Sequence, residues 1–344
     1  MHGFTTLSFA SAVLVAVLSF SPLPAAATQS HAIPSSSTRH HRRGVPTYKL
    51  TQNLKGKNFY DAFDFFTDAD PTGGLVNYQS LADARAKNLT HADAGSFVIR
   101  GDMTTKLVAG QKRDSVRIES KRAYKTHLQV FDVAHMPEGK GTWPAYWMSG
   151  DNWPYNGELD ILEGANDIGP NLISLHTGPN CTMPEPDSLI RVQKGSIKAN
   201  DCFAYATGSN TGCGVFGDSK RDFGPALNKA GGGWFVTERR PEYIKVWFWS
   251  HQDKNVPAVV KNGGKVIDSS KFGRPTASFP GTSCSLGSQF GPNKIIINLT
   301  YCGGFAGHTF LPGGTPECEK FVAENPVESS GKAYWNIRSL RIYE

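Results

Sequence analysis

Strand-like segments recur along the chain, and they limit its fold more than any other feature. Each is a short run of β-branched and aromatic residues, or of alternating apolar and polar ones, bounded by Gly, Pro, Asn or Asp. The runs are Ser96–Arg100, Ser115–Glu119, His127–Val133, Ala145–Met148, Gly157–Leu162, Leu172–His176, Gly233–Thr237, Tyr243–Trp249, Lys294–Thr300 and Tyr334–Tyr343. Helical patterns occur at Tyr78–Lys87 and Glu317–Glu324. We predict an all-β fold, a jelly-roll sandwich of two antiparallel sheets.

The composition excludes several classes of protein. Of 344 residues, 39% are hydrophobic and 19% charged, which is typical of a globular chain and not of a disordered or collagen-like one. The net charge of +6 includes Arg39, Arg42 and Arg43, so the chain after residue 43 carries only +3. This charge is too small and too dispersed for a nucleic-acid-binding protein. A single apolar run, at the N-terminus, excludes a multi-pass membrane protein.

The N-terminus has the pattern of an export signal. Leu7–Phe20 is apolar, and Ala25–Ala27 offers an A-x-A cleavage site, so residues 1–27 are predicted to be a signal peptide. A membrane anchor is the alternative, which the short run and the lack of a nearby following basic residue disfavour.

Residues 28–43 form a second segment, rich in serine, histidine and arginine. We predict that this segment is flexible. Its Arg42-Arg43 pair is either a processing site or part of a solvated basic linker, and both readings stay open. Residues 44–344 contain no Pro/Ser-rich linker and are predicted to form a single catalytic domain.

Six cysteines indicate an oxidising compartment. None forms a C-x-x-C pair, which disfavours a zinc ribbon or redox motif, and an even number favours disulfides. Three lie in 181–213 and three in 284–318, so if all six pair, at least one bond joins the two clusters. The individual pairing stays open among 15 connectivities. Sequons at Asn88, Asn180 and Asn298 also point to a secreted, glycosylated protein.

Three acidic residues lie within six positions of the segment Gly157–Gly164. In a regular strand Glu158 and Asp160 share one face, whereas Glu163 points to the opposite face. A single β-bulge near Ile161–Leu162 would return Glu163 to the face of the other two. Like charges this close raise one another's pKa values, so a purely structural strand has little reason to carry them.

Clustered carboxyl groups of this kind suit glycoside hydrolysis. A retaining enzyme holds a nucleophile and an acid/base about 5–5.5 Å apart, and the bulge would place Glu158 and Glu163 at such a separation. Asp160 between them would help to split their pKa values. A calcium site and a solvent-exposed acidic edge are the alternatives. Calcium loops have a different acid spacing with glycine turns, and an exposed edge would not be flanked by so many tryptophans.

The flanking aromatic residues fit a sugar ligand, because aromatic rings stack on the C–H faces of pyranose rings. Trp147 and Trp153 are surrounded by polar residues and are predicted to bind substrate, whereas Trp143 fits the core and the site equally well. His176 follows on the next strand and could hydrogen-bond a catalytic acid or the substrate; a structural histidine is the alternative. Trp247 and Trp249 are predicted to belong mainly to the core.

From about Tyr48 to Glu344 the sequence resembles fungal glycoside hydrolase family 16. It is most similar to the secreted endo-β-1,3(4)-glucanases of the laminarinase type. The motifs that carry the resemblance are "GTWP", "NGELDILEGANDIGPNLISLHTGPNC", "DSVRIESKRAY", "IKVWFW", "IIINLTYCGGFAG" and "AYWNIRSLRIY". The combination of E-x-D-x-x-E with the upstream Trp-Pro and the downstream histidine makes the resemblance specific.

The resemblance implies a jelly roll with a concave substrate cleft and a retaining double displacement without metal or cofactor. It implies Glu158 as nucleophile, Glu163 as acid/base and Asp160 as their assistant. The cleft histidine of the family matches His176. Positions that grip glucose units on the non-reducing side match Arg117, Trp147 and Trp153.

Two departures from the family pattern bear on the site. Phe305 stands where relatives often have tryptophan, which puts sugar stacking on the leaving-group side in question. Lys140 stands where relatives often have cysteine, so one disulfide of those relatives is expected to be missing.

The sequence thus predicts endo-acting, retaining hydrolysis of β-1,3-glucans and of mixed β-1,3(4)-glucans. A transglycosylase of the same fold and a non-catalytic glucan-binding lectin are the alternatives. The expected partner is a polysaccharide, with neither nucleic acid nor, in the mature form, a membrane. We expect a monomer that is secreted to the extracellular space or the cell wall.

Overall fold

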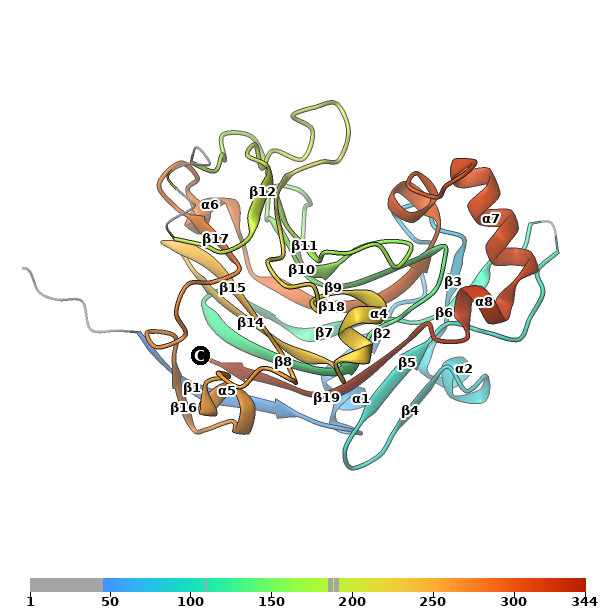
Figure 1. The fold of residues 1–344 in the computed structure, drawn as a ribbon, viewed down its shortest axis with the longest axis horizontal. Helices are drawn as coiled ribbons and strands as arrows, with labels where there is room; N and C mark the ends of the chain where they lie inside the picture. Colours follow the sequence, from blue (N-terminus) through green and yellow to red (C-terminus); the bar gives the residue numbers. More distant parts are fainter. Residues whose placement is uncertain (1–45, 109, 185–187, 189–191) are drawn as a thin grey trace, which may run out of the picture. The chain divides into compact units, whose positions relative to one another are not determined.

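The computed structural model describes residues 46–108, 110–184, 188 and 192–344 (Figure 1). Residues 45–344 form one compact unit. The predicted signal peptide, residues 1–27, and the basic segment, residues 28–43, lie outside the described residues. A single domain spanning 44–344 stays a prediction.

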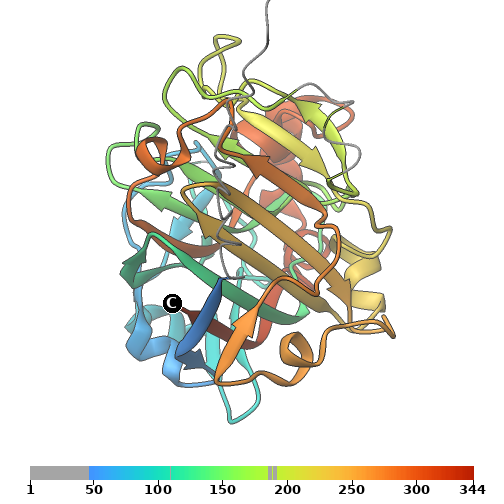
Figure 2. The same ribbon diagram turned by 90° about the vertical axis from the view of Figure 1, so that its left-hand side faces the viewer.

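Two large antiparallel sheets form the body of this unit. The first has nine strands in the order β16-β1-β19-β8-β14-β15-β17, with β5 also paired to β19 and β4 to β5. Its strands are β1 (Thr47–Leu54), β4 (Thr90–Ala92), β5 (Phe97–Arg100), β8 (His127–His135), β14 (Gly233–Arg240), β15 (Tyr243–Ser250), β16 (Val266–Asp268), β17 (Ala277–Pro280) and β19 (Tyr334–Tyr343). Figure 2 shows the edge at which the blue β1 lies beside the orange β16.

The second sheet has eight strands in the order β12-β13-β11-β10-β9-β18-β7-β2. Its strands are β2 (Phe63–Phe65), β7 (Arg117–Tyr124), β9 (Thr142–Gly150), β10 (Glu158–Glu163), β11 (Leu172–His176), β12 (Ser196–Ala199), β13 (Cys213–Phe216) and β18 (Asn293–Tyr301). In Figure 1 these strands lie as a layer against β8, β14 and β15. A short parallel pair joins β3 (Val76–Tyr78) to β6 (Arg113–Ser115).

Helices are short and lie between the strands. Those described are α1 (Asn58–Ala62), α2 (Leu81–Ala86), α4 (Gly224–Lys229), α5 (Ala258–Asn262), α6 (Leu286–Gln289), α7 (Gly314–Glu324), α8 (Pro326–Ser330) and the π-helix η1 (Gly303–Gly307). None of the helices described is long and apolar enough to cross a membrane.

The main core lies between the two sheets. Alternate residues of β10 and β14, among them Leu159 and Phe235, are fully buried in it. The residues that alternate with them on β14 and β15 point to the outer face of the nine-stranded sheet, where Trp234, Trp247 and Trp249 form a second apolar cluster. The prediction that Trp247 and Trp249 belong to the core is therefore confirmed.

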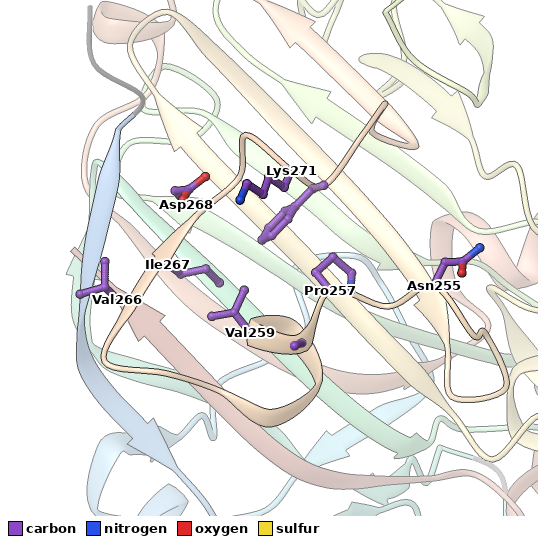
Figure 3. A pocket seen from close by; sticks show the side chains of 9 residues that line it. Asn255, Pro257, Val259, Val266, Ile267, Asp268 and Lys271 are labelled. Atoms are coloured by element: carbon purple, nitrogen blue, oxygen red, sulfur yellow. The ribbon is translucent and has the colours of Figure 1, made fainter.

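A cavity of about 390 Å³ lies beside this second cluster, next to α5 and β16 (Figure 3). Val259, Ile267 and Phe272 are among its lining residues, with Asn255 and Lys271 at the rim. It belongs to the nine-stranded sheet, whereas the predicted site residues lie on or beside the eight-stranded one.

Several predicted element boundaries need correction. Tyr78 is not helical but ends β3, paired with Ser115, and α2 begins only at Leu81 because the Ser80 side chain caps it by accepting from Asp83 N. Ser115 accordingly belongs to β6, and β7 runs from Arg117 to Tyr124. The other strands that were not anticipated are β1, β2, β4, β12, β13, β16 and β17; apart from β1, each has only three or four residues, too short for a periodic signal.

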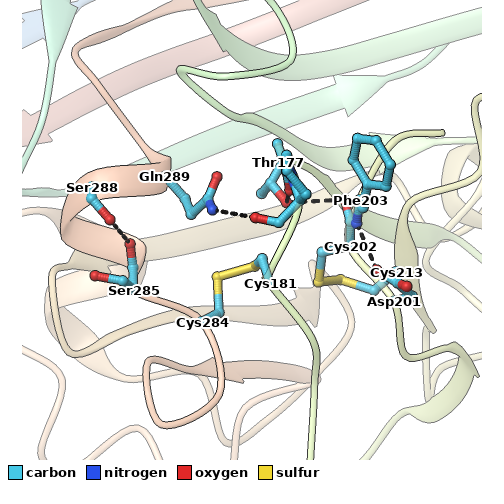
Figure 4. The surroundings of a disulfide bond; sticks show 12 residues. Thr177, Cys181, Asp201, Cys202, Phe203, Cys213, Cys284, Ser285, Ser288 and Gln289 are labelled. Carbon is cyan, nitrogen blue, oxygen red and sulfur yellow. Dashed lines mark hydrogen bonds between the residues drawn. A yellow bond between two sulfur atoms is a disulfide. The ribbon is translucent and has the colours of Figure 1, made fainter. Parts of the chain in front are cut away.

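The six cysteines form three disulfides: Cys181–Cys284, Cys202–Cys213 and Cys302–Cys318. Cys181–Cys284 joins the two sequence clusters, as the odd number in each cluster requires (Figure 4). Lys140, where relatives often have cysteine, places its ammonium group 4.3 Å from the centre of the Phe310 ring. A cation–π contact therefore occupies this position.

Candidate active site

The predicted β-bulge is present in β10. Its pairing with β9 runs from Glu158 opposite Ser149 to Asp160 opposite Trp147 and then resumes at Leu162, so Ile161 is the extra residue. Leu159, Ile161 and Leu162 are fully buried in the core. The bulge restores the parity of Glu163, and the three acids share the face directed away from the core.

Asn171 holds this bulge in place. Its side-chain Nδ2 donates to the carbonyl of Ile161 at 2.8 Å, and its Oδ1 accepts from the backbone N–H of Glu163 at 2.9 Å. Asn171 is itself 1% exposed, and its backbone N–H donates to Asp222. The Asn171 side-chain amide thus provides hydrogen-bond partners for the two backbone groups that lose theirs in the sheet at the bulge.

Strand register gathers further predicted residues on the same face, which we call the acidic face: the outward face of the eight-stranded sheet that carries Glu158, Asp160 and Glu163. His176 on β11 pairs directly with Glu158. On the other side, Arg117 on β7 pairs with Asn298 on β18, Asn298 pairs with Ala145 on β9, and Ala145 pairs with Glu163. Trp147 lies opposite Asp160.

His176 interacts with two of the acids. Its Nε2 lies 3.3 Å from Asp160 Oδ2 and 3.9 Å from Glu158 Oε1. Asp160 Oδ2 and His176 Nδ1 are both buried, and among the described residues neither atom has a partner with hydrogen-bond geometry. A buried polar cluster left partly unsatisfied in this way has capacity to bind a further polar group.

Asp160 is buried and Glu158 and Glu163 are partly buried, and this loss of solvent dominates their protonation. Burial, with the nearby charge of Asp160, raises the pKa of Glu163 from 4.5 to about 8, although the hydrogen bond from Trp143 opposes the rise. Burial also raises the pKa values of Glu158 and Asp160, and for Glu158 the nearby charge of Asp160 adds to the rise. At neutral pH the face therefore retains protons, which a general acid requires.

Trp143, which suits the core and the site equally well by sequence, contacts Glu163. Its indole Nε1 donates to Glu163 Oε1 at 2.8 Å, and the side chain is half-buried. The ring of Phe305, from η1, lies edge-on to Trp143 with ring centres 5.6 Å apart. Phe305 thus contacts Trp143, which in turn donates a hydrogen bond to Glu163.

Trp147 is oriented by Asn298. Its indole Nε1 donates to Asn298 Oδ1 at 2.8 Å, while Asn298 Nδ2 donates to the Tyr78 hydroxyl at 3.2 Å. The guanidinium of Arg117 lies 5.0 Å from the centre of the Trp147 ring and donates to Glu119. Asn298 is a predicted sequon, but it is 6% exposed and its amide is used in this network.

Trp153 reaches the site from the loop between β9 and β10. Its indole N–H lies near Glu158 and counters the rise in the pKa of that acid. The same buried Nε1 atom lacks a partner with hydrogen-bond geometry among the described residues. All nine predicted site residues therefore lie on the acidic face or at its margin.

Three residues of the site were missed by the sequence analysis: Asn171, Asn298 and Tyr78. Asn298 was considered only as a sequon, and Asn171 only as part of a motif. The sole sequence signal for either was a polar side chain next to or within an apolar strand run.

Ligand atoms of Glu158, Asp160 and His176 lie within 4.8 Å of one another, close enough to coordinate a metal ion. The chemistry of the set fits proton transfer equally well, because neighbouring carboxyl groups with raised pKa values can share a proton. Nothing in the donor set itself requires a metal.

Residues 63–343 match the family model described as the XgeA-like, catalytic glycoside hydrolase family 16 domain. An endo-1,3(4)-beta-glucanase of Arthroderma benhamiae is 37% identical over 311 residues, 88% of this chain and 66% of that protein. This chain thus spans about two thirds of that relative. The chain is also similar to two solved structures.

One solved structure is laminarinase 16A from Phanerochaete chrysosporium, a family 16 enzyme with 6-O-glucosyl-laminaritriose in both donor and acceptor sites. It is 45% identical with a TM-score of 0.82, covering 87% of this chain and 100% of that one. The other is an elongating family 16 beta-1,3-glucosyltransferase, 36% identical with a TM-score of 0.79, covering 86% and 100%. These likenesses confirm the predicted jelly-roll fold class, and the chain belongs to glycoside hydrolase family 16.

Proposed function

We propose that this chain hydrolyses internal bonds of laminarin-type β-1,3-glucans, and of mixed β-1,3(4)-glucans, with retention of anomeric configuration. The observation that carries the proposal is the bulge in β10, because it presents the buried Asp160 and the partly buried Glu158 and Glu163 together on one face. The similarity to laminarinase 16A and to an endo-1,3(4)-beta-glucanase supports the substrate class.

In the proposed mechanism Glu163 is the general acid. Its raised pKa keeps it protonated at neutral pH, and it gives its proton to the glycosidic oxygen as the bond to the anomeric carbon breaks. The Glu158 carboxylate attacks the anomeric carbon and forms a glycosyl-enzyme. Glu163, now ionised, takes a proton from water, and the resulting hydroxide attacks the same carbon and releases Glu158.

Asp160 and His176 support these two roles. Asp160 lies between the glutamates on the strand and 3.3 Å from His176 Nε2. A proton held between Asp160 and His176 would let Glu158 ionise without three negative charges on one face. Arg117, Trp143, Trp147, Trp153 and Phe305 are proposed to bind glucose units.

A time course with laminarin tests the proposal, with product size and anomeric configuration read together. Early short products with the β-configuration are expected. Glu158→Gln should fold and bind laminarin but lose hydrolysis. Initial α-anomers, or near-normal turnover by Glu158→Gln, would contradict the proposal.

Transglycosylation is the second candidate, because the chain is also similar to an elongating beta-1,3-glucosyltransferase. The same glycosyl-enzyme would be attacked by a sugar hydroxyl instead of water. Phe305, beside Trp143, lies close to the acid/base, where an acceptor would be held. Products longer than the starting oligosaccharides would favour this activity over hydrolysis.

The proposed partner is therefore a β-glucan. We also propose that the protein acts outside the cell as a monomer, in the extracellular space or the cell wall. The three disulfides and the similarity to a fungal glucanase support an extracellular location. Mass spectrometry of protein from the culture medium would test both secretion and the predicted removal of residues 1–27.

A further inference from the structure

Two tyrosines stand out by their exposure. Tyr155 is 55% exposed and Tyr205 is 48% exposed, and among the described residues no other Phe, Tyr or Trp is in the exposed class. Within the described part of the chain, neither hydroxyl is hydrogen-bonded to another residue. Exposed aromatic rings that lie close together indicate a binding surface more often than single ones do.

Tyr205 contacts Trp153, which lies near the predicted nucleophile, and Tyr155 is close to Trp153 in the sequence. Tyr155 follows Trp153 by two residues in the loop between β9 and β10. The Tyr205 ring lies edge-on to Trp153, with ring centres 5.7 Å apart, and edge-on to Phe203 at 5.9 Å. An aromatic surface therefore continues outward from Glu158 through Trp153 to Tyr205.

The loop that carries Tyr205 is fixed to strand β11 at both ends. At its start, Thr177 N donates to the Cys202 carbonyl at 2.8 Å, and Ala204 N donates to the Thr177 carbonyl at 3.1 Å. Cys202–Cys213 closes the loop (Figure 4). At its end, Gly212 packs so closely that a Cβ there would lie 2.8 Å from His176 Nδ1.

This anchoring gives Tyr205 a defined position relative to the catalytic residues. Thr177 directly follows His176, so the loop begins beside the site and returns to it. A ring held by a preformed loop binds a ligand with a smaller entropy loss than a ring on a free loop does. Binding of a sugar is therefore a better account of the exposed ring than chance exposure.

We propose that Tyr155 and Tyr205 form an outer sugar-binding subsite, which extends the glucan site beyond Trp153 and makes the enzyme favour longer chains. The inference rests on the proposed function, since the occupant is the same β-glucan chain. A β-glucan chain is the expected occupant because Tyr205 contacts Trp153, Tyr155 follows Trp153 in the same loop, and their rings and hydroxyls match the C–H faces and hydroxyl groups of glucose.

The test compares substrates of different length. Tyr155→Ala, Tyr205→Ala and the double variant are assayed with laminarin and with the shortest laminari-oligosaccharide that the wild type cleaves. For the double variant, kcat/KM on laminarin should fall by about fivefold to tenfold, the loss of one or two aromatic contacts. On the shortest substrate it should change less than about twofold, because that chain ends before the outer subsite.

Two sets of control variants test whether the loss on laminarin is due to the missing rings. Val266→Ala removes a side chain that is 49% exposed on β16 of the other sheet, and it should leave both substrates unaffected. Tyr155→Phe and Tyr205→Phe keep the rings and should retain most of the preference for laminarin. An equal loss on both substrates would overturn the inference, because it would mean that the tyrosines only support Trp153.

Binding separates failure of this inference from failure of the proposed function. Laminarin affinity is measured in the Glu158→Gln background, with and without the two alanine substitutions. If the wild type cleaves no β-glucan, the proposed function fails. If laminarin binds equally well with and without the tyrosines, the outer subsite fails, whatever the activity of the wild type.

Discussion

The outer faces of the two sheets carry the same kinds of side chain but pair them differently. On the nine-stranded sheet, Asp132 Oδ1 lies 2.9 Å from His251 Nε2, and Asp132 Oδ2 accepts from Trp234 Nε1 at 3.0 Å. His251 Nδ1 lies 2.6 Å from the carbonyl of Gly231. Each polar atom of this acid–histidine–tryptophan group has a partner within the protein.

On the acidic face the corresponding group is incomplete. Asp160 Oδ2, His176 Nδ1 and Trp153 Nε1 are buried, and none has a hydrogen-bond partner among the described residues. A satisfied group stabilises the fold, whereas an unsatisfied one weakens the fold and can bind a ligand. Pairing, and not residue type, therefore distinguishes the two faces.

The largest expected effect comes from the same substitution on both faces. Asp160→Asn should lower kcat on laminarin by about a hundredfold or more, because it removes the acid that couples Glu158 to His176. Asp132→Asn should leave kcat unchanged and lower the free energy of unfolding by about 1–3 kcal/mol. Steady-state kinetics and urea unfolding of both variants measure this. A loss of kcat in Asp132→Asn would by itself contradict the proposed difference between the two faces.

A smaller effect is expected from the amide that holds the bulge. Asn171→Asp loses the donor to the Ile161 carbonyl and should shift Glu163 out of line. We expect kcat to fall about tenfold with KM within about twofold, since an interaction made in the transition state is weakened. The pH profile of kcat should change as well, because Glu163 would leave the environment that raises its pKa.

Asn228 provides the matched control. It bridges backbone groups in the same way, with Oδ1 accepting from Met136 N and Nδ2 donating to the Met136 carbonyl, both at 2.8 Å. Asn228 lies in α4, and Met136 directly follows the end of β8 on the nine-stranded sheet. Asn228→Asp should lower stability and leave kcat and its pH profile unchanged. Equal kinetic loss in both variants would show that Asn171 is merely structural.

Local periodicity explains what the sequence could predict of the site. The side chains of a strand alternate, so the spacing of Glu158, Asp160 and Glu163 was enough to predict both the shared face and the bulge. The cysteine clusters likewise required a bond between them, and Cys181–Cys284 is that bond. Neither inference needed knowledge of which strands are neighbours.

Contacts between distant segments explain what the sequence could not predict. Asn171 acts on the bulge only because β10 turns back into β11, and Tyr205 meets Trp153 only because its loop is anchored beside His176. Trp143 was undecided because a tryptophan in a strand suits a core and a site equally well, and its hydrogen bond to Glu163 favours the site. The order in which strands and loops become neighbours creates these contacts, and it has no local signal in the sequence.

The smallest expected effect is a difference in the free energy of unfolding between substitutions of two glutamates, one on each sheet. On the nine-stranded sheet, Glu238 accepts hydrogen bonds from Tyr48, Tyr243 and Ser269, so Glu238→Gln should lower the free energy of unfolding by about 1–3 kcal/mol. Glu163→Gln should instead raise it by about 1 kcal/mol at pH 7. The neutral amide can still accept from Trp143, and it removes the cost of a buried acid.

The sign of this gain follows from the raised pKa of Glu163. Between pH 4.5 and about 8 the unfolded chain has released this proton while the folded chain retains it, so the stability of the wild type falls as pH rises through this window. The gain from Glu163→Gln should therefore be present at pH 7 and absent at pH 4. Urea unfolding at both pH values measures it. A stabilisation of the same size at pH 4, or a destabilisation at pH 7, would mean that the acidic face is satisfied like its counterpart.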